Sequence, residues 1–319
     1  MSSWSKQPIK IIQKPGYIQK TPAGIFDSKK TKPATVVSAY YAVKSRAEQS
    51  IYKERMRLFL ENLPVHLIFF CEEDLVPFVK TCRQNYEDRT VIIPLNRTEW
   101  NANIKYNDEE MWQSQLDKDP EKELHSVDLY KLWFEKKEFV ITAIDINPFD
   151  HDDFIWMDAG IIREEALVKL IKDNFPVSSR IPNDRILLLN VKPYLAEDDI
   201  KSNSPSQITG KFERKDRIGA GIIAGNKELW LTWSNIYDKT IDRYLEEGRF
   251  IGKEQSIMST IVLENKNLVS LINPPKNFGQ KWFYSLIYLG VSEKRFQVLN
   301  SYAKDTIESY QSISGIPSS

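Results

Sequence analysis

Short apolar segments alternate with longer amphipathic segments over the first third of the chain. Residues 35–41, 65–70 and 90–95 are rich in β-branched and aromatic residues, which predicts buried strands. Apolar residues recur at helical spacing between them, over 45–63 and 73–84, which predicts helices. Strands that alternate with helices in this way are typical of a parallel sheet covered by helices. The pattern therefore predicts an α/β fold.

A polar stretch interrupts this alternation, and the pattern then resumes. Residues 101–125 are rich in Asn, Asp and Glu, so we expect an excursion from the sheet there. The composition of 201–210 favours a loop. Further strands are expected at 154–158, 185–190 and 218–225. Further helices are expected within 126–147, 226–248, 252–265 and 293–311.

The chain carries no internal repeat, and no linker interrupts residues 35–300. We therefore expect a single domain over 35–311, followed by a frayed tail at 312–319. Residues 1–34 precede this domain and hold seven lysines and one aspartate, which makes them a basic arm. Such an arm is either a solvated tail that packs partly on the domain or a contact for an anionic partner.

The overall composition limits the classes of function. The chain has 44 basic and 44 acidic residues, and this balance argues against a general nucleic-acid-binding protein, which would carry a basic excess. Aromatic residues make up 12% of the chain, which suits a sugar or nucleotide pocket and equally suits a large aromatic core. The 2 cysteines, Cys71 and Cys82, have no CxxC motif or histidine cluster beside them, so a zinc site is not expected.

The location of the protein is also predicted from its apolar segments. The first residues lack the apolar core of a signal peptide, and no apolar run approaches the roughly 18 residues of a membrane span. We therefore expect a soluble, cytoplasmic protein without a membrane span.

The sequence FIWMDAGIIRE, residues 154–164, contains the first candidate for chemistry, Asp158. Residues 150–153, which hold three aspartates and one histidine, resemble a metal cluster but precede the same predicted strand. Ligands in open α/β sheets gather outside the carboxyl ends of the strands. The strand separates the two groups by roughly 16 Å at about 3.3 Å per residue. Strand polarity therefore favours Asp158, either as a ligand of Mg²⁺ or Mn²⁺ or as a turn residue that bonds its own loop.

Two further segments have both a functional and a structural interpretation. The predicted strand IGAGIIAG contains Gly219, Gly221 and Gly225, which indicates either a ligand floor or close packing of the backbone. It is not a dinucleotide-binding fingerprint, because the glycines do not open a helix. Glu254 stands in the first turn of a predicted helix, where it either meets the helix dipole or serves as a general base.

Four segments resemble the HtrL/YibB-like proteins, which are regarded as relatives of the GT-A fold glycosyltransferases that use nucleotide sugars. The resemblance covers roughly residues 33–290. Its most specific parts are WMDAGIIRE and the segment from Trp133 to Lys136 with His125 upstream. The four segments are KPATVVSAYYAV, DKDPEKELHSVDLYKLWFEKKEFV, NPFDHDDFIWMDAGIIRE and GRFIGKEQSIM. The resemblance implies a GT-A-like (Rossmann-like) fold, with a mixed, mainly parallel sheet flanked by helices.

The resemblance also implies a nucleotide site on the first half of the sheet. It places Tyr40 and Arg46 near the base or phosphate of the donor, and Lys136 at the donor diphosphate. WMDAG then takes the place of the Asp-x-Asp metal motif, with Asp158 as the metal ligand. Gly160 stands where the motif has its second aspartate. The metal is therefore either absent or bound by a further ligand from another part of the chain. Arg163 is a further source of positive charge.

The remaining implications concern the acceptor side. The strand that contains Gly221 is expected to lie against the ligand, and Glu254 is the candidate base. A carboxylate base implies inversion at the sugar, whereas a retaining route needs none.

The predicted function is transfer of a sugar from a nucleotide-diphosphate-sugar donor to a hydroxyl of a saccharide or glycoprotein acceptor, with Mn²⁺ or Mg²⁺ as cofactor. One alternative is a catalytically silent relative that binds a glycan or a protein, because the second aspartate is missing. Another alternative is a different nucleotide-using transferase.

Overall fold

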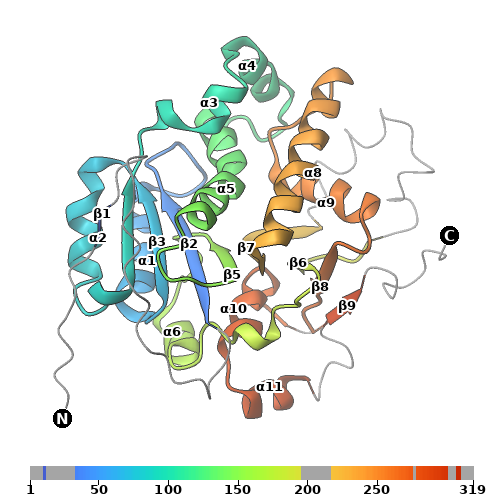
Figure 1. The fold of residues 1–319 in the computed structure, drawn as a ribbon. Coiled ribbons are helices and arrows are strands. Elements are labelled where there is room, and N and C mark those ends of the chain that lie inside the picture. The colour runs from blue at the N-terminus through green and yellow to red at the C-terminus, as the bar shows by residue number, and fades with distance from the viewer. Residues whose placement is uncertain (1–9, 12–32, 195–216, 276–277, 301–306, 310–319) are drawn as a thin grey trace.

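The computed structural model describes residues 10–11, 33–194, 217–275, 278–300 and 307–309. Within these ranges, nine strands form one sheet in the order β1-β4-β3-β2-β5-β7-β6-β8-β9 (Figure 1). The strands are β1 (Lys10–Ile11), β2 (Ala34–Tyr40), β3 (His66–Cys71), β4 (Thr90–Pro94), β5 (Asp153–Met157), β6 (Ile186–Asn190), β7 (Ile218–Asn226), β8 (Val269–Ile272) and β9 (Ile307–Ser309). The predicted α/β fold is therefore confirmed.

The sheet is mixed and mainly parallel. Strands β1 to β5 run parallel to one another where they pair, and β6 is parallel to β8. Strand β7 runs antiparallel to both of its neighbours, β5 and β6, and β9 is antiparallel to β8. All residues of β2 and β5 are buried, as expected for central strands that are covered on both faces.

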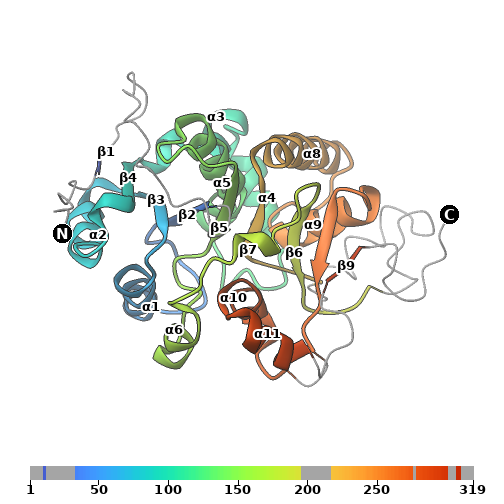
Figure 2. The same ribbon diagram turned by 60° about the horizontal axis from the view of Figure 1, so that its bottom comes forward.

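Helices cover both faces of the sheet, and Figure 2 shows the two layers on either side of the strands. The first layer packs its aromatic and aliphatic side chains into one buried cluster, and the second layer forms another. The first layer consists of α3 (Asn101–Lys105), α4 (Glu109–Lys118), α5 (Val127–Ile146), α8 (Lys227–Glu246) and α9 (Glu254–Glu264). The second contains α1 (Gln49–Asn62), α2 (Val76–Cys82), α6 (Glu165–Ile171) and α10 (Tyr284–Gly290), with α11 (Glu293–Asn300) following.

Two local predictions need correction or qualification. The expected helix over 293–311 ends at Asn300, and residues 307–309 form strand β9 instead, because their backbone pairs with β8. The expected excursion at 101–125 contains the helices α3 and α4. The loop expected at 201–210 and the tail at 312–319 lie outside the described residues. Of the basic arm, Lys10–Ile11 pairs with β4 as strand β1, and Ala34 begins β2.

The residues at the amino end of β5 stabilise the turn that leads into it. Asn147 ends α5 in the left-handed conformation, and its side chain bonds both the N–H and the C=O of His151. His151 in turn lies 2.9 Å from the Thr35 hydroxyl, and Asp152 pairs with Lys227 at 2.9 Å. These contacts give the 150–153 segment a structural role at the edge opposite Asp158.

Among the described residues, no helix combines the length and the apolar character that crossing a membrane would need. Cys71 and Cys82 are both buried and free.

Candidate active site

Asp158 lies immediately after β5, at the carboxyl end of that strand. Its backbone N–H donates to the Gly221 carbonyl at 2.9 Å, which extends the β5–β7 ladder by one residue. The Trp156 indole donates to Asp158 Oδ1 at 2.8 Å and so fixes the orientation of the carboxylate. The side chain remains 40% exposed, so one face of the carboxylate is open to a ligand.

Lys136 reaches Asp158 from α5, which packs across β2 and β5. Its Nζ lies 2.9 Å from Asp158 Oδ1 and 2.6 Å from Glu254 Oε1. Burial works to lower the pKa of Lys136, but the two carboxylates outweigh it, and the pKa stands above its usual value. Lys136 is therefore a charged ammonium held between two carboxylates.

Glu254 is the first residue of α9, and it is only 2% exposed. Burial raises its pKa from 4.5 to about 7; the Asp158 charge adds to this, whereas Lys136 opposes it. Its Oε2 is buried without a hydrogen-bond partner among the described residues. A carboxyl group with such a pKa can exchange a proton near neutral pH, which is the property a general acid or base needs.

Two glycines surround Asp158 at close range. A Cβ atom at Gly221 would lie 2.8 Å from Ile161 Cδ1 and 3.6 Å from Asp158 Oδ2. A Cβ atom at Gly160 would lie 2.9 Å from the Tyr52 ring. Tyr52 thus occupies the direction in which a second aspartate side chain would extend, and Gly160 has no room for one unless that ring moves.

Asp158 can bind a divalent cation through one of its two carboxylate oxygens. Oδ1 already accepts from Lys136 and Trp156, whereas the described residues form no hydrogen bond to Oδ2. Mg²⁺ and Mn²⁺ are commonly held by one or two carboxylates together with water and substrate phosphates. Asp158 Oδ2 is therefore a possible ligand atom, and the substrate would supply the others.

A second group of possible metal ligands, which the sequence did not reveal, consists of Asp119, Glu121 and His125. Their ligand atoms lie within 4.8 Å of one another. Asp119 already accepts from Tyr130 at 2.5 Å and lies 2.6 Å from His125 Nδ1. Glu121 is paired with two cations, Arg46 and Lys253. A network so fully paired fits a structural role better than a metal site. In the sequence, this group could have been recognised only from the spacing of the three residues in DPEKELH.

The other predicted site residues lie in different surroundings. Arg46 pairs with Glu121 at 2.6 Å, and Lys253, the residue before Glu254, pairs with the same carboxylate. Tyr40 ends β2 and packs into the layer of α1 and α6, with its hydroxyl buried and without a partner among the described residues. Arg163 lies over the Phe283 ring, 4.6 Å from its centroid, on that same side. The structure thus brings together Asp158, Lys136, Glu254 and Gly221. Tyr40, Arg46 and Arg163 make contacts with other residues instead.

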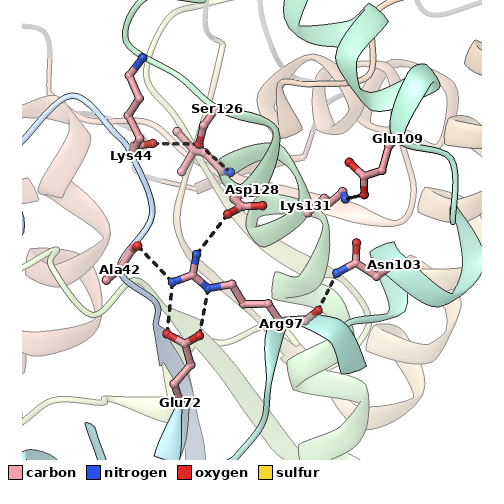
Figure 3. Close-up of polar contacts among 10 residues, drawn as sticks. Ala42, Lys44, Glu72, Arg97, Asn103, Glu109, Ser126, Asp128 and Lys131 are labelled. Carbon is pink, nitrogen blue, oxygen red and sulfur yellow. Dashed lines mark hydrogen bonds and ion pairs between the residues drawn. The ribbon is translucent and has the colours of Figure 1, made fainter. Parts of the chain in front are cut away.

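Arg97, which the sequence did not single out, joins the loops at the carboxyl edge of the first strands (Figure 3). It follows β4 and makes two hydrogen bonds to Glu72, after β3, at 3.1 and 3.2 Å. It also donates to the Ala42 carbonyl, after β2, and to Asp128 at the start of α5, both at 3.1 Å. One guanidinium therefore fixes three loops and a helix start at the edge where a nucleotide is expected.

Comparison with known proteins gives one match in sequence. Residues 32–286 match the family described as "Bacterial protein of unknown function (HtrL_YibB)". The chain belongs to the HtrL/YibB family. No protein with a curated description matches this HtrL/YibB chain in sequence.

Solved structures that are similar to this HtrL/YibB protein share little sequence with it. Mouse xyloside xylosyltransferase 1 in its apo form has a TM-score of 0.43 and 12% identity, over 90% of this chain and 100% of its own. The S. cerevisiae mannosyltransferase Ktr4p has a TM-score of 0.44 and 12% identity, over 82% of this chain and 74% of its own. Core-mannan synthase A from Aspergillus fumigatus, in an Mn/GDP form, has a TM-score of 0.43 and 10% identity, over 78% and 74%.

Proposed function

We propose that this protein is a glycosyltransferase that moves a sugar from a nucleotide-diphosphate donor to a hydroxyl of a saccharide or glycoprotein acceptor. The observation that carries the proposal is the group of Asp158, Lys136 and Glu254 at the carboxyl end of β5. It combines an open carboxylate, a buried ammonium and a carboxyl group with a pKa near neutrality. The resemblance of the HtrL/YibB family to nucleotide-sugar enzymes supplies the substrate class.

The open face of Asp158 is proposed to bind the donor side. A divalent cation held at Asp158 Oδ2 would supply positive charge to the leaving diphosphate. Lys136 holds the other oxygen of Asp158 at 2.9 Å. The Trp156 indole prevents rotation of that carboxylate, so the ligand atom is positioned before the substrate arrives.

Glu254 is proposed to accept the proton of the acceptor hydroxyl. Its Oε2 has no competing hydrogen bond among the described residues, while Lys136 holds Oε1. Because the pKa of Glu254 is about 7, the fraction available as a base increases as the pH rises through neutrality. A carboxylate base on the acceptor implies inversion at the transferred carbon.

A second candidate function is a binding protein without turnover. The ion pairs of Lys136 with both carboxylates favour it, because they neutralise part of the charge that a cation would need. In that case the protein would bind a nucleotide or glycan and release no product.

A measurement of nucleotide binding distinguishes the proposed glycosyltransferase from proteins that use no nucleotide. We expect a nucleoside diphosphate with Mn²⁺ to raise the melting temperature, and the raised value to fall back when the cation is chelated. The Glu254→Gln variant should keep this shift and lose sugar transfer, because it retains the donor side and removes the base. Absence of any shift with all common nucleoside diphosphates would overturn the proposal.

A further inference from the structure

The connection between α4 and α5, residues 119–126, contacts two loops that come from distant parts of the chain. One is the loop that follows β2, and Ser126 donates to a backbone carbonyl of that loop at 3.2 Å (Figure 3). The other is the loop 247–253, which joins α8 to α9, pairs with Glu121 and ends immediately before the candidate base. The connection therefore links a loop at the carboxyl edge of the sheet to the helix start that bears this base.

Glu121 joins the two loops through its charge. Its Oε1 lies 2.6 Å from Arg46 Nη2, and its Oε2 pairs with Lys253 Nζ. The Arg46 side chain is 68% exposed, whereas that of Lys253 is only 7% exposed. The hydrogen bond from Lys253 holds the pKa of Glu121 below its usual value, so the carboxylate stays ionised between the two cations. One carboxylate thus ties the loop after β2 to the residue that precedes Glu254.

The backbone of Glu121 is held in place by the buried side chain of Asp119. Asp119 Oδ1 accepts from the Glu121 N–H at 2.8 Å. Its Oδ2 accepts from Tyr130 of α5 at 2.5 Å and lies 2.6 Å from His125 Nδ1. Because Asp119 and His125 are both buried, this network is a rigid support from which the Glu121 side chain extends.

The residues that lead into α9 are held by the same part of the chain. The Ile251 N–H donates to the buried Gln115 Oε1 of α4 at 2.9 Å. A Cβ atom at Gly252 would lie 3.1 Å from Tyr130 Cε2, so the backbone passes close to that ring. Each of the three residues before Glu254 is therefore held by α4, by α5 or by the connection between them.

We infer that Glu121 is a positioning residue for Glu254, which sets the first turn of α9 through Lys253 and the loop after β2 through Arg46. A base must lie within hydrogen-bond reach of the proton that it accepts, and a small displacement lowers the rate strongly. Without the charge of Glu121, the buried Lys253 ammonium loses a partner, and moving it toward water displaces the first turn of α9. The role of Glu254 as the base rests on the proposed function, whereas the joining of the two loops does not.

Amide hydrogen exchange of the full chain tests the joining of the loops without any substrate. Glu121→Gln keeps the shape of the side chain and removes its charge. Glu123→Gln is the matched control, because Glu123 is an exposed carboxylate of the same connection. We expect exchange in Glu121→Gln to be at least about threefold faster in residues 42–48 and in residues 251–258, because both loops lose an ion pair. Unchanged exchange in either segment, or equal acceleration in Glu123→Gln, would overturn the inference.

Donor hydrolysis, in which water takes the place of the acceptor hydroxyl, separates a positioning role from a purely structural one. The rate would be measured at saturating nucleotide sugar and divided by the stoichiometry of nucleotide binding, which measures the folded fraction. Glu121→Gln and Lys253→Gln should each lower this rate at least about tenfold, and Lys253→Arg, which keeps the charge, should retain most of it. A rate per binding site that stays at the wild-type value in Glu121→Gln would overturn the positioning role.

The two measurements also separate this inference from the proposed function. If the wild type hydrolyses no donor, the proposed function fails, and the exchange measurement still decides whether Glu121 joins the two loops. If the wild type is active and the loops of Glu121→Gln exchange as in Glu123→Gln, the inference fails and the proposed function stands.

Discussion

Lys136 is the side chain on which the charge of the candidate active site depends. Its ammonium is buried together with Glu254, whereas Asp158 keeps contact with solvent. Removing an ion from water costs several kcal/mol, and a buried charge is tolerated only when its partner remains. Lys136 and Glu254 therefore form the buried half of the site, and Asp158 forms the open half.

Replacing Lys136 by methionine should lower the free energy of unfolding by about 3–5 kcal/mol, because Glu254 would lose its buried partner. Urea denaturation measures the change. Lys239→Met is the control, since Lys239 is an exposed residue of α8. A loss of less than about 1 kcal/mol for Lys136→Met would show that the ion pair is not formed as described.

The raised pKa of Glu254 predicts a dependence of stability on pH. The folded protein binds the Glu254 proton more tightly than the unfolded chain, whose carboxyl has a pKa of 4.5. The contribution of this proton to stability is therefore complete below pH 4.5 and is lost as the pH rises to about 7. As the pH rises over this window, the wild type should therefore lose unfolding free energy relative to the Glu254→Gln variant. A constant difference from acid to neutral pH would contradict the assignment.

At the scale of elements, the site depends on strand ends and helix starts that the chain brings together from distant positions. The polarity of the strand at 154–158 was enough to prefer Asp158 over the aspartates before it, and β5 confirms that position. The contact of Lys136 with Glu254 joins residues 118 positions apart and could not be predicted from spacing. Arg97 was missed for the same reason, because its partners follow β2 and β3 or begin α5.

Arg97→Lys tests whether one guanidinium fixes these loops. A lysine cannot reproduce the paired bonds to Glu72 together with those to Asp128 and Ala42. We expect the free energy of unfolding to fall by about 1–3 kcal/mol, and amide hydrogen exchange to accelerate in residues 42–46. Arg57→Lys is the matched control, because Arg57 is an exposed residue of α1 whose ion pair is with Glu61 of the same helix and whose ring contact is with Phe78. If the amide hydrogens of residues 42–46 exchange at the same rate in both variants, Arg97 does not hold the loops.

At the scale of the whole molecule, the sequence predicted the parallel half of the sheet better than the antiparallel half. The strands expected at 35–41, 65–70 and 90–95 are present, because buried parallel strands consist of continuous apolar runs. The glycine-containing strand was also found, but not the direction of β7, since periodicity contains no information about strand direction. The pairing of Ile307–Ser309 with β8 was missed because it depends on a long-range contact.

The central claim is that the carboxyl end of β5 binds and activates a nucleotide sugar, and donor hydrolysis tests it most directly. The purified protein would be incubated with a panel of nucleotide sugars, with and without Mn²⁺, and the released nucleoside diphosphate measured. Asp152→Asn is the matched control, because Asp152 lies at the opposite end of the same strand in an ion pair with Lys227. We predict hydrolysis of at least one donor by the wild type and by Asp152→Asn, and a loss of about 100-fold or more in Asp158→Asn, as for removal of a key charge-stabilising group. Hydrolysis by Asp158→Asn at the wild-type rate, or no hydrolysis of any donor by the wild type, would contradict the account.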